Sequence, residues 1–528
     1  MSRRATAPNA FRLARGLAAL ILLASAARAQ DLIGDFPNIV VPPGNPPTTE
    51  KILLGKALFF EEQMSSDDTV ACATCHLPEA GGGDPRSGAR SPGVDGVMNT
   101  LDDEFGSPGV ILQDPDGNFQ DHPVFGVVRQ PTPRNSPSAI NAVFFNTQFW
   151  DARALPTFRD QNGQVVLPEF ASLETEAVEP PKSAVEMSHP QRDWTAISAK
   201  LARVRPLELA SDIPTDLEQF IGTSQTYGPL FARAFGTSEI NRERAAMAMA
   251  SYERTLVSDQ SPFDLGTMTA QQQAGFVVFQ TKGICETCHP SSNRFFSDGA
   301  SRTIFLPNHD RVVKTPSLRN VGLRPRYMSG GVFPSLALVI AHYRSIGFLT
   351  TQPGDVGALI DFLENGLTDP RLAARQPPFD RPTLRSERQP PGTNLYGQAT
   401  RGSDRINPEI LGDSPPFLGN QSFQIGLGRG LGGAHGMLLL STKQAVPGAN
   451  FRGVPLNVDF PSAIRKPLIL TRGGPGHGVA TFRMTVPVDP ALLDLDFFAQ
   501  GFVLDPGATL GIAASKGAHF QIFTRPQD

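Results

Sequence analysis

Cysteine is scarce in this sequence, with only four residues in a chain of 528. All four fall into two short motifs, so none is left to form a structural disulfide bridge. The chain also lacks an excess of positive charge: its formal net charge is −4, which argues against nucleic-acid binding. Beyond the N-terminus, no apolar run is long enough to span a membrane, which argues against a transmembrane protein.

The N-terminus has the features of a secretory signal. Four arginines among the first fifteen residues precede an apolar run from Gly16 to Ala26, which is too short to cross a bilayer. The triplet Ala27-Arg28-Ala29 fits a small-x-small cleavage site. We therefore expect residues 1–29 to be a cleaved signal peptide and the protein to be exported, for example to the periplasm. An uncleaved membrane anchor is the alternative.

The cysteines form two Cys-x-x-Cys-His motifs. They read Cys72-Ala73-Thr74-Cys75-His76 and Cys285-Glu286-Thr287-Cys288-His289. Two thiols three positions apart on a helical turn can bond the two vinyl groups of a haem, and the following imidazole can bind its iron. The motifs therefore predict two covalently bound haem c groups. A zinc site is the alternative, but it would leave both histidines unexplained.

A segment with helical features precedes each motif. Glu50 to Phe60 has the pattern of an amphipathic helix, and Thr269 to Gln272 resembles a capping box. Phe276 and Phe279 then form an apolar stripe that leads to the second motif. This order of helix and haem motif is typical of small cytochrome units.

The chain divides into regions of different composition. We predict a mainly α fold in which two cytochrome c-like haem domains, residues 48–205 and 206–375, are followed by a linker at 376–404 and an all-β sandwich at 405–528. Glycine (50 residues) and proline (48) are abundant, which indicates long loops. One Gly/Asp/Pro-rich insertion, residues 79–133, cannot be regular structure throughout.

Short strand-like runs separated by Gly/Pro turns recur in the C-terminal region, which favours an antiparallel β-sandwich. The predicted strands are Ser422–Leu427, Met437–Thr442, Leu468–Thr471, Val479–Val486, Phe497–Leu504 and Phe520–Phe523.

Several further blocks occur in a fixed order around the haem motifs. They are Leu54–Phe60, Arg134–Pro137, Asn141–Phe144, Gln148–Arg153, Glu186–Met187, Lys314–Val321 and Tyr327–Met328. With these blocks, residues 48 to about 375 resemble the bacterial dihaem cytochrome c peroxidase family, which includes MauG.

The resemblance implies unequal roles for the two motifs. His76 would hold the substrate-binding iron and His289 the electron-transfer iron. Trp150 matches a tryptophan between the haems, and Glu186 matches a carboxylate that moves a proton during peroxide cleavage. Taken alone, Trp150 is better explained as a core aromatic and Glu186 as a solvated surface charge, and the flanking blocks favour the functional roles. Glu176 stands where the family commonly has glutamine.

The resemblance also implies a calcium ion between the haems. Asn135 matches a side chain of that site, and the backbone carbonyls of Arg324 and Arg326 would complete it. Both arginines replace other residue types of the family.

The second axial ligand of the second haem sets the subtype. Tyr343 falls on the ligand position, which is methionine in the peroxidases and tyrosine in MauG. A phenolate ligand stabilises ferric iron, whereas a thioether raises the reduction potential. His342 and Met328 are the competing candidates. For the first haem, His122 is a candidate cap.

The resemblance implies an exported peroxidase that reduces hydrogen peroxide with electrons from a small c-type cytochrome or a similar protein donor. A MauG-like enzyme that oxidises residues of a partner protein is the first alternative. A non-enzymatic two-haem electron carrier is the second. A homodimer is compatible with each of these.

Overall fold

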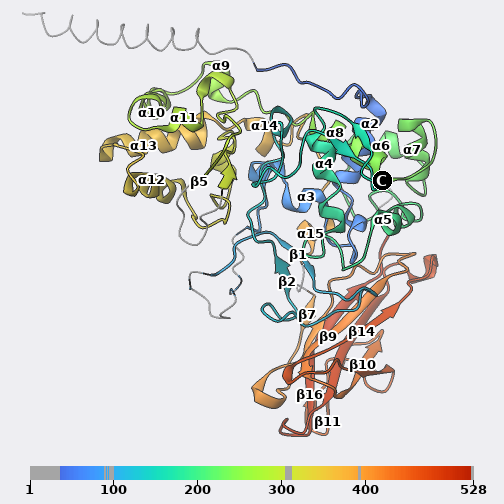
Figure 1. Cartoon of the computed structure of the whole chain (residues 1–528). Helices are drawn as coiled ribbons and strands as arrows, with labels where there is room; N and C mark the ends of the chain where they lie inside the picture. The colour runs from blue at the N-terminus through green and yellow to red at the C-terminus, as the bar shows by residue number, and fades with distance from the viewer. Residues whose placement is uncertain are drawn as a thin grey trace, which may run out of the picture.

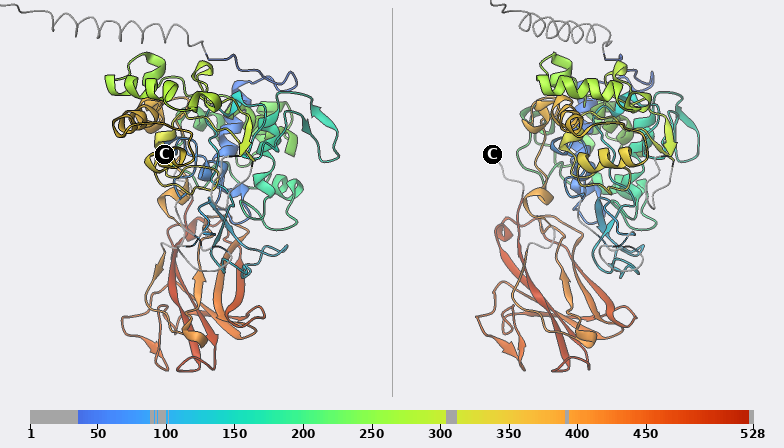
Figure 2. Two further views of the ribbon diagram at one scale, coloured as in Figure 1. Left: turned by 60° about the vertical axis from the view of Figure 1, so that its left-hand side comes forward. Right: turned by 90° about the vertical axis from the view of Figure 1, so that its left-hand side faces the viewer.

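The computed structural model describes residues 36–87, 91, 93, 100, 102–303, 312–390 and 394–524. The predicted signal peptide lies outside the described residues. Two groups of helices lie side by side, and a module of strands extends away from them (Figure 1). Two further views show the same separation of helical and β-rich parts (Figure 2).

The first helical group surrounds the first Cys-x-x-Cys-His motif. Its helices are α2 (Thr49–Phe59), α3 (Cys72–Cys75), α4 (Ser172–Ala177), α5 (Trp194–Leu201), α6 (Thr215–Ile221), α7 (Gly228–Phe235) and α8 (Arg242–Glu253). Helix α2 packs against α8 at Gly55, where a side-chain methyl group would overlap the carbonyl oxygen of Ala248. The short strands β3 (Phe158–Arg159) and β4 (Val165–Leu167) form a hairpin beside this core.

The second helical group repeats this arrangement around the second motif. Its helices are α9 (Pro262–Leu265), α10 (Ala270–Thr281), α11 (Cys285–Cys288), α12 (Leu336–Ser345) and α13 (Pro353–Asp361). Helix α10 begins at the predicted capping box, in which Thr269 and Gln272 each accept a hydrogen bond from the other's backbone N–H. Strands β5 (Ser301–Thr303) and β6 (Val312–Lys314), which lie between α11 and α12 in the chain, pair with each other.

Gly275 provides the close helix contact of the second group. A methyl group there would overlap the carbonyl of Ala358 in α13, whereas Gly357 has open space around its own Cβ position. We expect Gly275→Ala to lower the free energy of unfolding by about 1–3 kcal/mol through overpacking. The matched control Gly357→Ala should raise it by roughly 0.5–1 kcal/mol, because alanine favours a helix. Urea unfolding of both variants measures the difference, and equal stabilities would contradict this packing.

The boundary between the helical groups lies later in the chain than the predicted 205/206. Helices α6, α7 and α8 contribute to the same core as α2, and that core extends to Leu256. The predicted linker, residues 376–404, is also partly packed, because Phe379 and Leu384 are fully buried in this first core. The short helix α14 (Pro370–Ala373) precedes the predicted linker, and α15 (Arg385–Arg388) lies within it.

The C-terminal region is a two-sheet module. One antiparallel sheet has the order β13-β10-β15-β16-β7 and the other β14-β9-β8, and buried residues of both form one core. The strands are β7 (Leu395–Tyr396), β8 (Glu409–Leu411), β9 (Phe423–Leu431), β10 (His435–Ser441), β13 (Ile464–Ile469), β14 (Pro475–Met484), β15 (Asp496–Leu504) and β16 (Ile512–Gln521), with the hairpin β11 (Asn450–Phe451) and β12 (Val454–Pro455).

This module makes the prediction of a mainly α fold wrong. Helices account for 28% of the residues and strands for 21%, so the chain is a mixed α and β protein. Part of the insertion at 79–133 adds to the strands, because it pairs β1 (Pro108–Ile111) with β2 (Arg129–Pro131). The same insertion packs Phe119 and Val127 against Val479 of β14, which attaches the β module to the first helical group.

Candidate active site

A cavity of about 300 Å³ lies beside the first motif. Its lining includes Cys72, Cys75 and His76 from α3 and its C-terminal end, and both residues predicted to be catalytic, Trp150 and Glu186. Segments more than a hundred positions apart in the chain therefore meet around the first histidine.

Each of the two motif histidines is held by a hydrogen bond from its ring to a backbone carbonyl. The Nδ1–H of His76 donates to the carbonyl of Gly82 at 3.2 Å, and that of His289 donates to the carbonyl of Phe296 at 2.8 Å. Burial lowers the pKa of both imidazoles, which favours the neutral form. A neutral ring fixed through Nδ1 leaves Nε2 to bind a metal, as in other histidine-ligated sites.

Four carboxyl groups line the first cavity: Asp151, which pairs with Arg134 and Arg153, and three glutamates. Glu176 comes from α4, Glu186 from the turn after Pro180–Lys182, and Glu253 from the end of α8. Burial raises the pKa of Glu186, while the Ser183 hydroxyl acts in the opposite direction. Burial and the neighbouring Glu186 raise the pKa of Glu176 to about 7. Proton-carrying groups therefore face this cavity near neutral pH.

Trp150 lies between the two motifs. Its indole N–H donates to the carbonyl of Asn135 at 2.6 Å, and its own carbonyl accepts from the backbone N–H of Lys314 at 2.7 Å. The side chain is 8% exposed and lines both the first cavity and a second one. The indole is thus a fixed partition between the two sites.

The second cavity, about 410 Å³ in volume, lies beside the second motif. Cys285, Cys288 and His289 line it together with mainly apolar side chains. Four cationic side chains also reach it, namely Arg302, Lys314, Arg319 and Arg324. The cavity has no lining carboxylate among the described residues, so the two sites differ in polarity and charge.

Tyr343 and Met328 both line the second cavity, whereas His342 does not. The His342 ring packs instead near Phe333, with ring centroids 5.3 Å apart. Burial raises the pKa of Tyr343 to about 12, so only a strongly positive partner would hold it as a phenolate. Tyr343 and Met328 therefore remain the two geometrically suitable candidates for a second ligand.

His122 is not brought to the first cavity. Its Nδ1 accepts hydrogen bonds from the backbone N–H groups of Val124 and Phe125, both at 3.1 Å. The ring stacks on Phe125, within the insertion that contacts the β module. The suggestion that this histidine caps the first haem is therefore wrong for this conformation.

The predicted calcium ligands are close together but already paired. The Asn135 side chain donates to the carbonyl of Arg326 at 3.1 Å and accepts from Ser87, also at 3.1 Å. The buried Arg324 guanidinium donates to the carbonyl of Ser136, next to Asn135. A fixed positive charge beside these oxygens disfavours a second cation. Within the described residues, no group of three His, Cys, Asp or Glu side chains is arranged to hold a metal ion. Calcium stays a prediction.

The two motif sites fit covalently bound haem. Each combines paired thiols on one helical turn, an imidazole fixed through Nδ1, and an adjoining cavity. At the first cavity Arg134 and Arg153 pair with Asp151, and at the second Arg302 and Arg319 pair with Asp298 and Asp264. Lys314 and Arg324 donate to backbone carbonyls instead, so they are the cations best suited to neutralise haem propionates.

The attachment can be tested on the second motif. We expect Cys288→Ser to remove one of its two thioether bonds, so that acid and organic solvent extract the second haem more easily. Mass spectrometry of the haem-loaded protein before and after extraction measures the retained mass. A variant as resistant as the wild type would rule out a thioether at this position.

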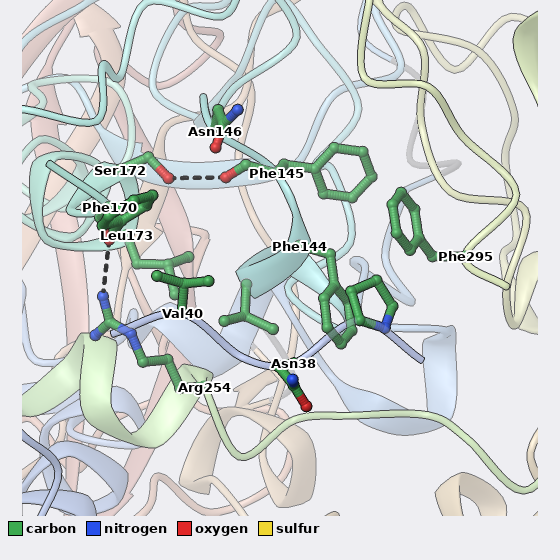
Figure 3. Close-up of a pocket in the computed structure, with 12 residues that line it drawn as sticks. Asn38, Val40, Phe144, Phe145, Asn146, Phe170, Ser172, Leu173, Arg254 and Phe295 are labelled. Atoms are coloured by element: carbon green, nitrogen blue, oxygen red, sulfur yellow. Dashed lines mark hydrogen bonds between the residues drawn. The ribbon is translucent and has the colours of Figure 1, made fainter. Parts of the chain in front are cut away.

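A third cavity, about 180 Å³, lies where the helical groups meet (Figure 3). Phe144 of the first group stacks on Phe295 of the second, with ring centroids 5.5 Å apart and nearly parallel planes. Arg254 borders this cavity and pairs with the buried Glu174 at 2.8 Å. None of the motif cysteines or histidines lines it, so it belongs to the contact between the two helical groups and not to either motif site.

Sequence reasoning missed two residues of the first cavity. Glu253 reaches it from α8, and Arg153 is held there by stacking on Phe149 (guanidinium carbon to ring centroid 3.6 Å) and by pairing with Asp151 at 2.9 Å. Arg153 belongs to the block Gln148–Arg153, which carries part of the family resemblance, so the sequence contained a signal that it is near the site. Glu253 is one charge in a regular helix, and nothing local distinguishes it.

Comparisons with known proteins agree with this site. A family model described as di-haem cytochrome c peroxidase matches residues 49–272. The methylamine utilization protein MauG of Methylorubrum extorquens is 30% identical over 324 residues, which cover 57% of this chain and 70% of that protein. MauG of Methylophilus methylotrophus is 28% identical over 331 residues, covering 58% and 76%. Cytochrome c551 peroxidase of Pseudomonas aeruginosa is 27% identical over 371 residues, covering 65% and 84%.

The chain belongs to the di-haem cytochrome c peroxidase family, in which MauG is included. This membership implies two haem c groups and an oxidoreductase that acts on peroxide. In the part of the chain that the structure describes, none of the helices combines the length and the apolar character needed to cross a membrane.

Proposed function

We propose that this chain is an exported dihaem enzyme that reduces hydrogen peroxide in the first cavity. The electrons would come from a small c-type cytochrome or a similar protein donor. The observation that carries the proposal is the difference between the two cavities: carboxyl groups face the first, and an apolar and cationic lining surrounds the second. A simple two-haem carrier has no need of that difference.

The haems would be held by the two motifs. Cys72, Cys75 and His76 would hold one, and Cys285, Cys288 and His289 the other. When bound, the haems supply iron that accepts and donates electrons. The remaining requirement of peroxide reduction is proton movement, because each peroxide takes up two protons and two electrons and leaves as two waters.

Glu186 is suited to that proton movement. It faces the first cavity, and burial raises the pKa of its carboxyl group, which makes it a better base than an exposed glutamate. In our proposal Glu186 takes a proton from one peroxide oxygen and returns it to the other, which leaves as water. Arg153 limits the rise in the pKa of Glu186, so that the carboxylate form stays accessible.

Trp150 would connect the two sites. The indole lines both cavities and is fixed by the hydrogen bond from its N–H to the carbonyl of Asn135. A large polarizable ring in this place offers a path for electrons between the sites, in addition to its packing role.

The second candidate function is MauG-like oxidation of residues on a partner protein. The observation that favours it is Tyr343, which lines the second cavity at the position where a phenolate ligand was predicted. A phenolate would stabilise oxidised iron at His289 and make that site slower to accept electrons from a cytochrome.

The proposal is tested by mixing the haem-loaded protein with a reduced small c-type cytochrome and hydrogen peroxide. We expect oxidation of two cytochromes for each peroxide consumed, because peroxide takes up two electrons. Oxidation of the cytochrome at the same rate without peroxide would contradict the proposal. Rapid peroxide consumption with no cytochrome oxidation would instead favour the MauG-like function.

A further inference from the structure

Glu176 and Glu186 form a carboxyl pair in the first cavity. Both side chains line it, one from α4 and one from the turn after Pro180–Lys182, and both are partly exposed to that space. Glu253 lines the same cavity but is only 6% exposed, and its Oε2 has no hydrogen-bond partner among the described residues. The cavity therefore collects three glutamates in addition to the ion-paired Asp151, although the movement of one proton needs only one carrier.

The surroundings of Glu176 come from several elements. Glu186, Glu253, Glu179 and Cys72 are the acidic groups that act on it, and Arg153 and Lys314 are the cationic ones. Lys314 comes from the second helical group, and its ammonium donates to the carbonyl of Thr147 at 2.6 Å. Two cations thus partly balance several carboxyl groups, and like charges that share one buried cavity do not all ionise together.

We propose that Glu176 is a second proton-carrying group of the first cavity: Glu186 moves peroxide's own proton between its two oxygens, and Glu176 supplies one of the two further protons that peroxide takes up. This inference rests on the proposed function. One peroxide, two protons and two electrons from the protein donor give two waters; Glu176 supplies one of these protons and solvent supplies the other. Glu176 then regains its proton from solvent before the next peroxide binds, and Glu186 ends the cycle as the carboxylate with which it began.

The residue type at position 176 decides this role. A glutamine amide of nearly the same shape can donate a hydrogen bond but cannot release a proton at neutral pH. Burial and the neighbouring Glu186 raise the pKa of Glu176 to about 7. Below this pH the carboxyl group is mostly protonated and can supply a proton, and above it the group is mostly ionised.

Glu253 has a supporting part. Burial raises the pKa of this carboxyl group, and Glu176 adds to the effect. The raised pKa of Glu253 favours its neutral form, and its Oε2, which has no hydrogen-bond partner among the described residues, has the adjacent Arg254 as its cationic neighbour. A neutral Glu253 leaves Glu176 and Glu186 as the exchanging pair.

The test is an infrared pH titration of the haem-loaded protein, from about pH 5 to about pH 9, that follows the C=O stretch of protonated carboxyl groups. We expect the wild type to lose one carboxyl band near neutral pH and Glu176→Gln to lack that change. Glu179→Gln is the matched control, because Glu179 is on the same stretch of chain, is 43% exposed and pairs with Lys182. It should keep the titrating band, with a midpoint moved slightly to lower pH because the charge of Glu179 contributes to the raised pKa of Glu176.

Peroxide kinetics complete the test. Glu176→Gln should slow the reaction with peroxide about tenfold at pH 6. It should also abolish the decrease in rate that we expect for the wild type as the pH rises through about 7. Glu176→Asp keeps a carboxyl group and should keep the titrating band. If the wild type reacts with peroxide, and Glu176→Gln shows the same infrared band and the same rate, then the role of Glu176 is overturned while the proposed function stands. If the wild type shows the band but does not react, the proposed function is overturned.

Discussion

Replacing Glu186 with glutamine is expected to lower kcat for peroxide reduction by roughly 10² to 10⁴-fold, the usual contribution of a positioned acid–base group. The substitution keeps the size and hydrogen-bonding shape of the side chain but removes its ability to accept a proton. Because Glu186 lines the first cavity beside His76, the effect should fall on the chemical step and leave haem content unchanged. Stopped-flow kinetics with peroxide, at equal haem occupancy, measure it.

The control for Glu186→Gln is Glu179→Gln, which removes a partly exposed carboxylate that pairs with Lys182 at 3.1 Å. This variant should retain the wild-type rate. Turnover by Glu186→Gln at the wild-type rate would show that another group moves the proton, and Glu176 would be the first to examine.

Replacing Tyr343 with methionine is expected to raise the reduction potential of the second haem by roughly 0.1–0.3 V, within the span of about 0.8 V over which axial ligands act. A thioether stabilises ferrous iron, whereas a phenolate stabilises ferric iron. Tyr343 lines the second cavity with His289, so its side chain is in the right site to act as a ligand. A spectroelectrochemical titration of wild type and variant gives the two potentials.

His342 provides the matched control for Tyr343. It is the adjacent residue in α12, yet it does not line the second cavity. We expect His342→Gln to leave the potential of the second haem nearly unchanged. If His342→Gln moves the potential and Tyr343→Met does not, the histidine is the ligand.

Local features were predictable from the sequence because their physical causes are local. The capping box at Thr269 depends on residues three positions apart, and α10 begins there. The two Cys-x-x-Cys-His motifs each fold into one helical turn with the histidine at its end. Most of the predicted strands of the β module also appear, because alternating residues between Gly/Pro turns specify them within a few positions.

Features that depend on distant contacts were not predictable. The domain boundary was placed too early because α6 to α8 join the first core only through contacts with α2, such as that between Gly55 and Ala248. The predicted linker contains Phe379, whose burial depends on a core formed far earlier in the chain. The place of Glu253 in the first cavity likewise follows from the packing of α8 on α2, which no pattern around residue 253 encodes.

The proposed function requires two unequal haem sites: one at His76 that is open to peroxide, and one at His289 that is closed by a second ligand such as Tyr343. Electron paramagnetic resonance of the resting, haem-loaded ferric protein tests this requirement most directly, before and after one equivalent of hydrogen peroxide. We expect one high-spin and one low-spin ferric signal at rest, and loss of the high-spin signal on adding peroxide. Two low-spin signals that do not respond to peroxide would contradict this account and identify a simple electron carrier.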